Sequence, residues 1–233
     1  MGGGYPVWDL AHFHTQIHSR LVELEGEWGS PLVLPIGLLL VVDEENGGSK
    51  TAQELVKRIF LLHAESKNVI DFYYLGWSFD ESIRKGRSAR GMRFSLREFQ
   101  RFRAALTRKG IRDFGGNADL ILVDAEKTKR DFVLHFERAI RIDLAAAIES
   151  ARLPSVGAFT QGLIRAAEEI RAEGTGENPV WRISDKLGLA SARQSMLETL
   201  FEKWGKWIGA GRLQALAVRK LGPPIRGIEL AVR

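Results

Sequence analysis

The chain has 233 residues, of which 45% are hydrophobic and 27% are charged, and its formal net charge is +5. These values are typical of a folded protein and exclude a fibrous or largely disordered chain. No cysteine is present, which excludes disulfides, thiolate zinc sites and a cysteine nucleophile and favours a cytoplasmic location. The first residues carry no signal-peptide or myristoylation pattern, so we expect no membrane partner.

The first predicted elements are a helix and a strand. Residues 8–25 place apolar side chains at steps of three and four, which predicts an amphipathic helix with one buried stripe. The apolar run 34–42 is too short to span a membrane and too apolar for a surface strand. We therefore predict a central strand that is buried on both faces and ends in the polar turn 43–48.

A helix, a strand and a loop are predicted next. Thr51 and Glu54 have the spacing of a capping box, which predicts a helix that continues through Ile59 and Phe60. Branched and aromatic residues at 69–75 predict a second strand. Residues 78–92 are polar and basic without an apolar period, and they predict a long loop.

A second capping box, from Ser95 to Glu98, predicts the next helix. Its expected buried positions are Leu96, Phe99, Phe102 and Leu106, and Gly110 fits its end. Residues 118–123 predict a third buried strand. The short charged turn 126–131 then requires an antiparallel hairpin with a strand at 132–136, because a parallel crossover needs a dozen residues or more. Helices are expected at 141–152 and 155–172, followed by a linker at 173–179.

Together these elements predict an α/β fold with three layers. The central sheet is expected to be mostly parallel with one antiparallel hairpin, and a mostly helical C-terminal region follows. The expected divisions are an N-terminal amphipathic helix at 1–30, an α/β core at 31–153 and the C-terminal region at 154–233. The order of elements resembles that of thioredoxin-like domains. That family keeps two cysteines after the first strand, where this chain has residues 46–49 without cysteine, so the resemblance implies no redox motif.

The strongest functional signal is the uneven charge distribution. Residues 84–113 contain eleven Lys or Arg and two acids, which gives this stretch +9 and the rest of the chain −4. Arginine predominates, and its planar guanidinium suits bidentate phosphate contacts. We predict that the loop and the following helix bind nucleic acid or another polyanion. The expected binding residues are Arg84, Lys85, Arg87, Arg90, Arg93, Arg97, Arg101 and Arg108. A solvated face, or a face that pairs with an acidic partner protein, remains the alternative.

Residues 183–201 are similar to a helix-turn-helix motif, with a glycine at the turn and Arg193 facing outward on the second helix. Arg193 would then contribute to DNA binding. A helical hairpin that packs on the sheet produces the same pattern, so both interpretations stay open.

The alternative catalytic residues are Asp43 and Asp124, which follow or end predicted strands. If these strands were parallel, both carboxylates would lie at one sheet edge and would suit a metal-dependent phosphoryl-transfer enzyme. No cofactor or resident metal site is expected otherwise, because His14 and His18 share a helix face without a third ligand. The leading hypothesis is a non-catalytic cytoplasmic binding module within a larger assembly, and the other alternative is a protein-interaction subunit.

Overall fold

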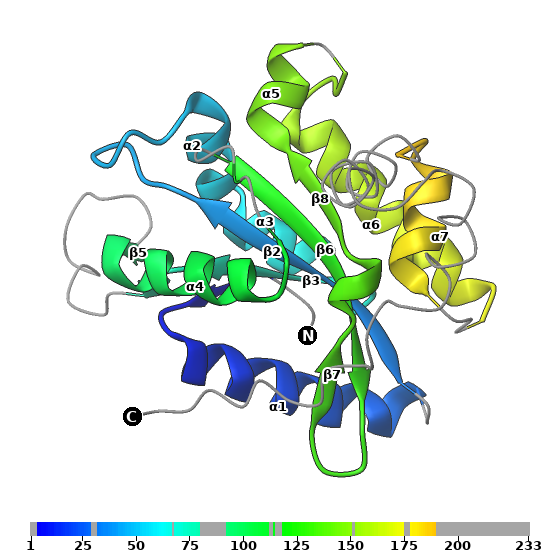
Figure 1. Cartoon of the computed structure of the whole chain (residues 1–233). Coiled ribbons are helices and arrows are strands. Elements are labelled where there is room, and N and C mark those ends of the chain that lie inside the picture. The colour runs from blue at the N-terminus through cyan, green and yellow to red at the C-terminus, as the bar shows by residue number, and fades with distance from the viewer. Residues whose placement is uncertain are drawn as a thin grey trace, which may run out of the picture.

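The computed structural model describes residues 4–28, 32–66, 68–79, 92–111, 114, 118–150, 152–174 and 178–189. A central six-stranded sheet carries helices on both of its faces (Figure 1). The predicted α/β fold, with helices on both faces of a central sheet, is confirmed.

The central sheet combines parallel and antiparallel pairs. Its strands are β1 (Gly4–Val7), β2 (Val33–Val41), β3 (Asp71–Leu75), β6 (Ala118–Lys127), β7 (Phe132–Leu134) and β8 (Ile140–Asp143). The spatial order is β1-β3-β2-β6-β7, and β8 also pairs with β6. β1, β3 and β2 are parallel to one another, whereas β6 is antiparallel to β2, β7 and β8. The predicted hairpin is the β6–β7 pair.

β2 is the central strand that the sequence predicts. Leu39 and Val41 belong to the hydrophobic cluster on one face of the sheet, and Leu38 and Leu40 belong to the cluster on the other. A side chain at Gly37 would place its Cβ 2.7 Å from the ring of Phe72. Glycine therefore allows the ring to pack directly against the backbone of β2.

Helices cover the two faces unequally. One face carries α1 (Leu10–Trp28) and α4 (Leu96–Arg108), and the other carries α2 (Lys50–Lys57), α3 (Ile59–Glu65), α5 (Leu144–Glu149), α6 (Val156–Ala172) and α7 (Pro179–Lys186). On the α1 side, the rings of Phe13 and Phe102 meet edge to face 5.9 Å apart. Ser155 caps α6, which buries Val156, Phe159 and Leu163.

The predicted helix after the 43–48 turn differs from the structure in two details. Ser49, not Thr51, is the N-cap, because its hydroxyl accepts a hydrogen bond from the Ala52 N–H. The helix is also divided at Arg58 into α2 and α3. The buried positions of this segment include Ala52, Leu55, Ile59 and Leu62.

Two strand assignments also differ from the prediction. Residues 140–143 form β8 instead of the start of a helix, and the helix that follows is the short α5, capped by Asp143. The ends of the predicted 78–92 loop form an antiparallel hairpin of β4 (Trp77–Phe79) and β5 (Met92–Phe94). Residues 80–91 lie outside the described part of the chain. No helix within the described ranges is long and apolar enough to cross a membrane.

Candidate functional site

The centre of the candidate site is α4, which forms where the sequence predicts it. The Ser95 hydroxyl accepts a hydrogen bond from the Glu98 N–H and caps the helix. Phe99, Phe102 and Leu106 face the core at helical spacing. Leu96 departs from the prediction because it is 44% exposed. After the helix, Gly110 adopts a positive φ of 92°, which a glycine tolerates without strain.

The β4–β5 hairpin fixes the position at which α4 begins. Trp77 on β4 donates a hydrogen bond from its indole N–H to the Val41 carbonyl, 2.9 Å away, and so attaches the hairpin to the central strand. The Gly76 N–H donates to the Val7 carbonyl, and the Gly76 carbonyl accepts from the Ser95 N–H, both at 2.8 Å. The N-cap of α4 is therefore held directly against the residue that joins β3 to β4.

Four arginines of β5 and α4 are exposed, and we name them the arginine strip. They are Arg93, Arg97, Arg101 and Arg108. Arg97 and Arg101 expose 78% and 54% of their side chains. Because an α-helix rises about 1.5 Å per residue, the helical part of the strip extends over about 16 Å. The structure therefore brings together all members of the predicted binding set that lie within the described residues.

One buried carboxylate contacts two members of the arginine strip. Glu98 accepts a hydrogen bond from Arg101 at 2.9 Å, and its Oε1 lies 4.0 Å from Nε of Arg97. Residues 92–111 contain six basic residues and this single acid. Local pairing thus removes only part of the positive charge of the segment.

The fourth arginine of α4 has a different environment. The guanidinium of Arg103 lies 5.1 Å from the ring centroid of Phe114 and 6.0 Å from that of Phe99. Arg141 on β8 also contacts this ring, with its guanidinium 5.9 Å from the Phe114 centroid. These cation–π contacts give Arg103 a structural role, so it is not part of the arginine strip.

The remaining predicted basic residues fall outside the part of the chain that the structure describes. They are Arg84, Lys85, Arg87, Arg90 and, on the second helix of the predicted helix-turn-helix, Arg193. The first part of that motif corresponds to α7 and the turn that follows it.

The predicted convergence of Asp43 and Asp124 does not occur. It required parallel strands, but β6 is antiparallel to β2, and Asp124 pairs with Pro35 near the beginning of β2. Asp43 follows the other end of β2, where its carboxylate accepts a hydrogen bond from the Asn46 N–H. The two carboxylates therefore lie toward opposite ends of β2 and do not form one metal site.

Asp124 nevertheless has an unusual environment. It is fully buried, and its Oδ1 accepts a hydrogen bond from the Val180 N–H at the start of α7, 3.0 Å away. Its Oδ2 has no hydrogen-bond partner among the described residues. Burial raises the pKa of Asp124 to about 6, although the Val180 N–H and the charges of Arg138 and His135 act in the opposite direction.

His135 lies close to Asp124 and joins two further carboxylates. Its Nε2 is 2.7 Å from Oε2 of Glu126, and its Nδ1 is 2.8 Å from Oε1 of Glu137. These two contacts hold the imidazole ring between the two carboxylates. The sequence gives no signal for this cluster, because η2 (Phe136–Arg138) turns the chain and brings Glu137 back toward His135.

A second buried ionic cluster lies on the opposite face of the sheet. Arg20 on α1 donates from Nε to Asp71 at 3.1 Å and from another guanidinium nitrogen to Glu23 at 2.7 Å. Burial lowers the pKa of Arg20, but Asp71 and Glu23 more than offset this effect, so its pKa is raised overall. Arg20 lies in the apolar stripe of α1 between Ile17 and Leu21. A charged residue at a buried helix position is the sequence feature that indicates this ion pair.

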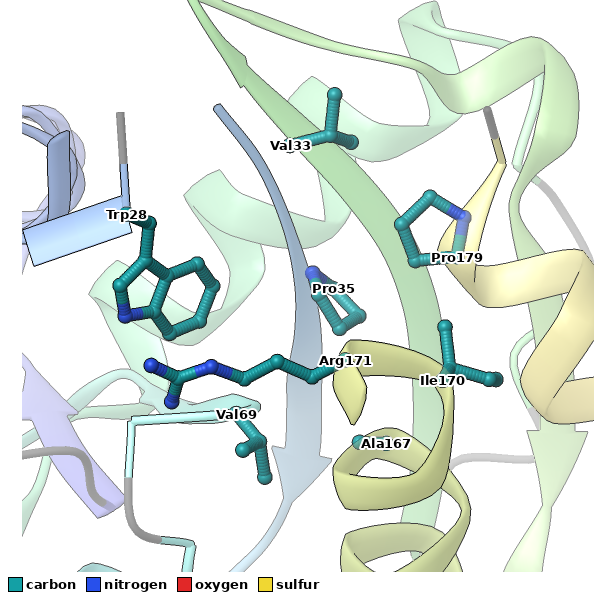
Figure 2. A pocket seen from close by; sticks show the side chains of 8 residues that line it. All are labelled: Trp28, Val33, Pro35, Val69, Ala167, Ile170, Arg171 and Pro179. Atoms are coloured by element: carbon teal, nitrogen blue, oxygen red, sulfur yellow. The ribbon is translucent and has the colours of Figure 1, made fainter. Parts of the chain in front are cut away.

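A small hollow lies between α1, β2, α6 and α7 (Figure 2). Its lining includes Trp28, Pro35, Arg171 and Pro179, and the guanidinium of Arg171 lies 3.8 Å from the indole centroid of Trp28. The hollow has a volume of about 20 Å³, which is room for about one water molecule. It is too small to hold an ordinary small-molecule ligand.

The histidines of α1 form contacts instead of a metal centre. His14 stacks on His18 with ring centroids 6.4 Å apart, and its Nε2 lies 3.1 Å from Oδ1 of Asp131. Across the described ranges, no group of three or more His, Asp or Glu side chains is arranged to hold a metal ion.

The described structure therefore defines an α/β protein with an exposed arginine strip and two buried ionic clusters. Comparison of the chain with protein-family models, with curated proteins and with solved structures gives no match.

Proposed function

We propose that this protein is a non-catalytic cytoplasmic binding module, part of a larger assembly, that binds nucleic acid or another polyanion through the arginine strip. The observation that carries the proposal is the charge imbalance of α4 and β5. Two of the exposed arginines share the Glu98 carboxylate, and six basic residues of this segment accompany that one acid. Phosphate contacts dominate the affinity of most nucleic-acid complexes, and arginines that are already exposed and positioned suit them.

The arrangement of α4 supports the same proposal. Its apolar side packs on the sheet through Phe99, Phe102 and Leu106, so the helix is rigidly held while its charged side faces solvent. A row of guanidiniums about 16 Å long can contact several consecutive phosphates without reorganising the fold. A partner protein with an acidic surface is the alternative occupant, and the exposed Leu96 beside Arg97 is the observation that favours it.

The test replaces Arg93, Arg97 and Arg101 together by alanine and measures DNA and RNA binding by fluorescence anisotropy at several salt concentrations. Each lost phosphate contact reduces the slope of log K against log salt by about 0.9 for duplex DNA or about 0.7 for a single strand. We expect the slope of the triple variant to fall by about 2 to 3 units. A matched control replaces Lys57, Lys129 and Arg130, which are exposed basic residues elsewhere in the structure.

The control variant removes the same formal charge and should lower affinity only slightly. Equal losses in the two variants would mean that net charge alone drives binding, and the arginine strip would not be the site. An unchanged salt slope in the strip variant would contradict the proposal directly.

A further inference from the structure

Glu98, the single acid of residues 92–111, is nearly buried although the arginines that it contacts are exposed. Its side chain is 10% exposed, whereas those of Arg97 and Arg101 expose 78% and 54%. Both carboxylate oxygens accept a hydrogen bond from Nη1 of Arg101, at 2.9 and 3.2 Å. Oε1 also lies 4.0 Å from Nε of Arg97. One carboxylate therefore pairs with two neighbouring members of the arginine strip.

The Glu98 side chain is not needed to cap α4. Glu98 is the third residue of the helix after the Ser95 N-cap, and in a capping box the glutamate at this position accepts a hydrogen bond from the N-cap N–H. Here the Ser95 N–H donates to the Gly76 carbonyl instead, at 2.8 Å. Burial of a carboxylate is unfavourable unless it is paired. The groups that pair with Glu98 are the arginines of the strip.

The contact with Glu98 leaves one edge of the Arg101 guanidinium available. Its hydrogen bonds to Glu98 use Nη1 alone, and Nε and Nη2 have no hydrogen-bond partner among the described residues. Two N–H groups on one edge of a guanidinium match two oxygens of a phosphate. A long side chain loses rotamer freedom when it binds a ligand, which lowers affinity. The hydrogen bonds to Nη1 impose part of this restriction before a ligand arrives.

We infer that Glu98 is a positioning residue of the polyanion site, which holds Arg101 so that its Nε and Nη2 bind one phosphate group together. This inference rests on the proposed polyanion-binding function and specifies how the arginine strip is prepared for its ligand. The negative charge of Glu98 repels a polyanion, whereas its hydrogen bonds orient the arginine that binds one. Charge and positioning therefore act in opposite directions, and an experiment must separate them.

The experiment compares Glu98→Gln with Glu98→Met. Both variants remove the same charge and have side chains of similar length, but only glutamine keeps an oxygen that can accept from Arg101. Binding to a single-stranded DNA oligonucleotide and to its duplex is measured by fluorescence anisotropy. Since ordering one long side chain is restored by glutamine alone, we expect Glu98→Met to bind about 2- to 10-fold more weakly than Glu98→Gln. Glu98→Gln should bind at least as tightly as the wild type, because it no longer repels the ligand.

The same comparison in an Arg101→Ala background distinguishes positioning from a general effect on the fold. If Glu98 acts through Arg101, the glutamine and methionine variants should bind equally when that arginine is absent. Thermal unfolding checks that each variant is folded, and Glu98→Ala replaces Glu98→Met if the methionine variant does not fold. Glu54 on α2 is the matched control, because it accepts a hydrogen bond from Arg58 at 3.3 Å outside the strip. Its glutamine and methionine variants should bind DNA equally.

The outcomes separate this inference from the proposed function. Equal binding by Glu98→Gln and Glu98→Met would refute positioning and leave polyanion binding standing. A difference that persists in the Arg101→Ala background would do the same, because Glu98 would then act independently of Arg101. If the variant that lacks Arg93, Arg97 and Arg101 binds DNA and RNA as tightly as the wild type, or the wild type binds neither, the proposed function is refuted and the inference with it.

Discussion

Two buried aspartates lie near the beginning of β2, on opposite faces of the sheet. Asp71 pairs with Ile36 across the β2–β3 ladder, and Asp124 pairs with the adjacent Pro35 across the β2–β6 ladder. Both are fully buried. Asp71 meets the guanidinium of Arg20, whereas the hydrogen bond to Asp124 comes from a peptide N–H of α7.

The difference shows two ways of burying a carboxylate. A guanidinium in direct contact supplies a full opposite charge, which offsets much of the desolvation of the ion. A single peptide N–H supplies only a partial charge, so burial dominates and the pKa of Asp124 rises to about 6. The α1 side of the sheet is therefore held by an ion pair, and the α7 side retains a carboxyl group that titrates near neutral pH.

The largest effect is expected from Arg20→Ala, which leaves Asp71 buried without its guanidinium. Breaking a buried ion pair by removing one partner typically lowers the free energy of unfolding by about 3 to 5 kcal/mol. Urea denaturation at pH 7 measures this loss. Glu23→Ala removes the exposed partner of Arg20 and should cost less than about 1 kcal/mol. Equal losses of stability in the two variants would contradict the prediction, because the buried contact of Arg20 with Asp71 would then contribute no more than its exposed contact with Glu23.

The second prediction concerns the pH dependence of stability. The folded-state pKa of Asp124 is about 6, and an aspartate in an unfolded chain has a pKa of about 3.9. The folded protein therefore binds this proton more tightly. Asp124 adds stability below about pH 4, and this contribution of about 3 kcal/mol is lost as the pH rises through about 6.

Asp124→Asn removes this titration while it keeps an oxygen that can accept from the Val180 N–H. The free energy of unfolding of the variant minus that of the wild type should thus increase by about 2 kcal/mol between pH 4 and pH 7. Denaturation curves at half-unit pH steps follow the change. A difference that stays flat over this range would show that Asp124 is solvated like an ordinary surface carboxylate.

The smallest effect is expected beside Asp71, at Tyr73. The Tyr73 hydroxyl is buried and has no hydrogen-bond partner among the described residues. Tyr73→Phe should raise the free energy of unfolding by up to about 1 kcal/mol, because it removes an unpaired polar group. Tyr74→Phe is the matched control, since the Tyr74 hydroxyl donates to the Leu55 carbonyl at 2.8 Å. The control should lose about 1 kcal/mol in the same denaturation assay. Changes of opposite sign in the free energy of unfolding would confirm that the Tyr73 hydroxyl is unpaired and the Tyr74 hydroxyl is hydrogen-bonded. Equal losses would contradict this difference.

Local patterns predicted the parts of the fold that depend on neighbouring residues. The Ser95 cap and the apolar spacing of α4 and α6 follow from side chains within a few turns, and the structure confirms them. The strand β1 and the β4–β5 hairpin were not predicted, because each depends on a partner distant in sequence. Their residues carry no periodic pattern of their own.

The candidate site was predictable to a similar degree. The charge count identified the exposed arginines of α4, since solvent-facing helix positions can be read from the spacing of Phe99 and Phe102. The antiparallel direction of β6, which separates Asp43 from Asp124, is a property of sheet topology and has no local signature. The rings of Phe60 and Phe79 stack although they belong to elements distant in sequence. Phe60 lies on α3, and the helix break at Arg58 that begins α3 was not predicted.

The pairing of β1 has a consequence for synthesis of the chain. Gly4 is made early, but its partner Phe72 is made many residues later. At a translation rate of about 5 to 20 residues per second, the first strand waits about 3 to 14 s for its partner. During this interval Val7, which is fully buried in the finished protein, has no sheet to cover it. The strand β1 is thus synthesised before β3, and it can join the sheet only after β3 has emerged from the ribosome.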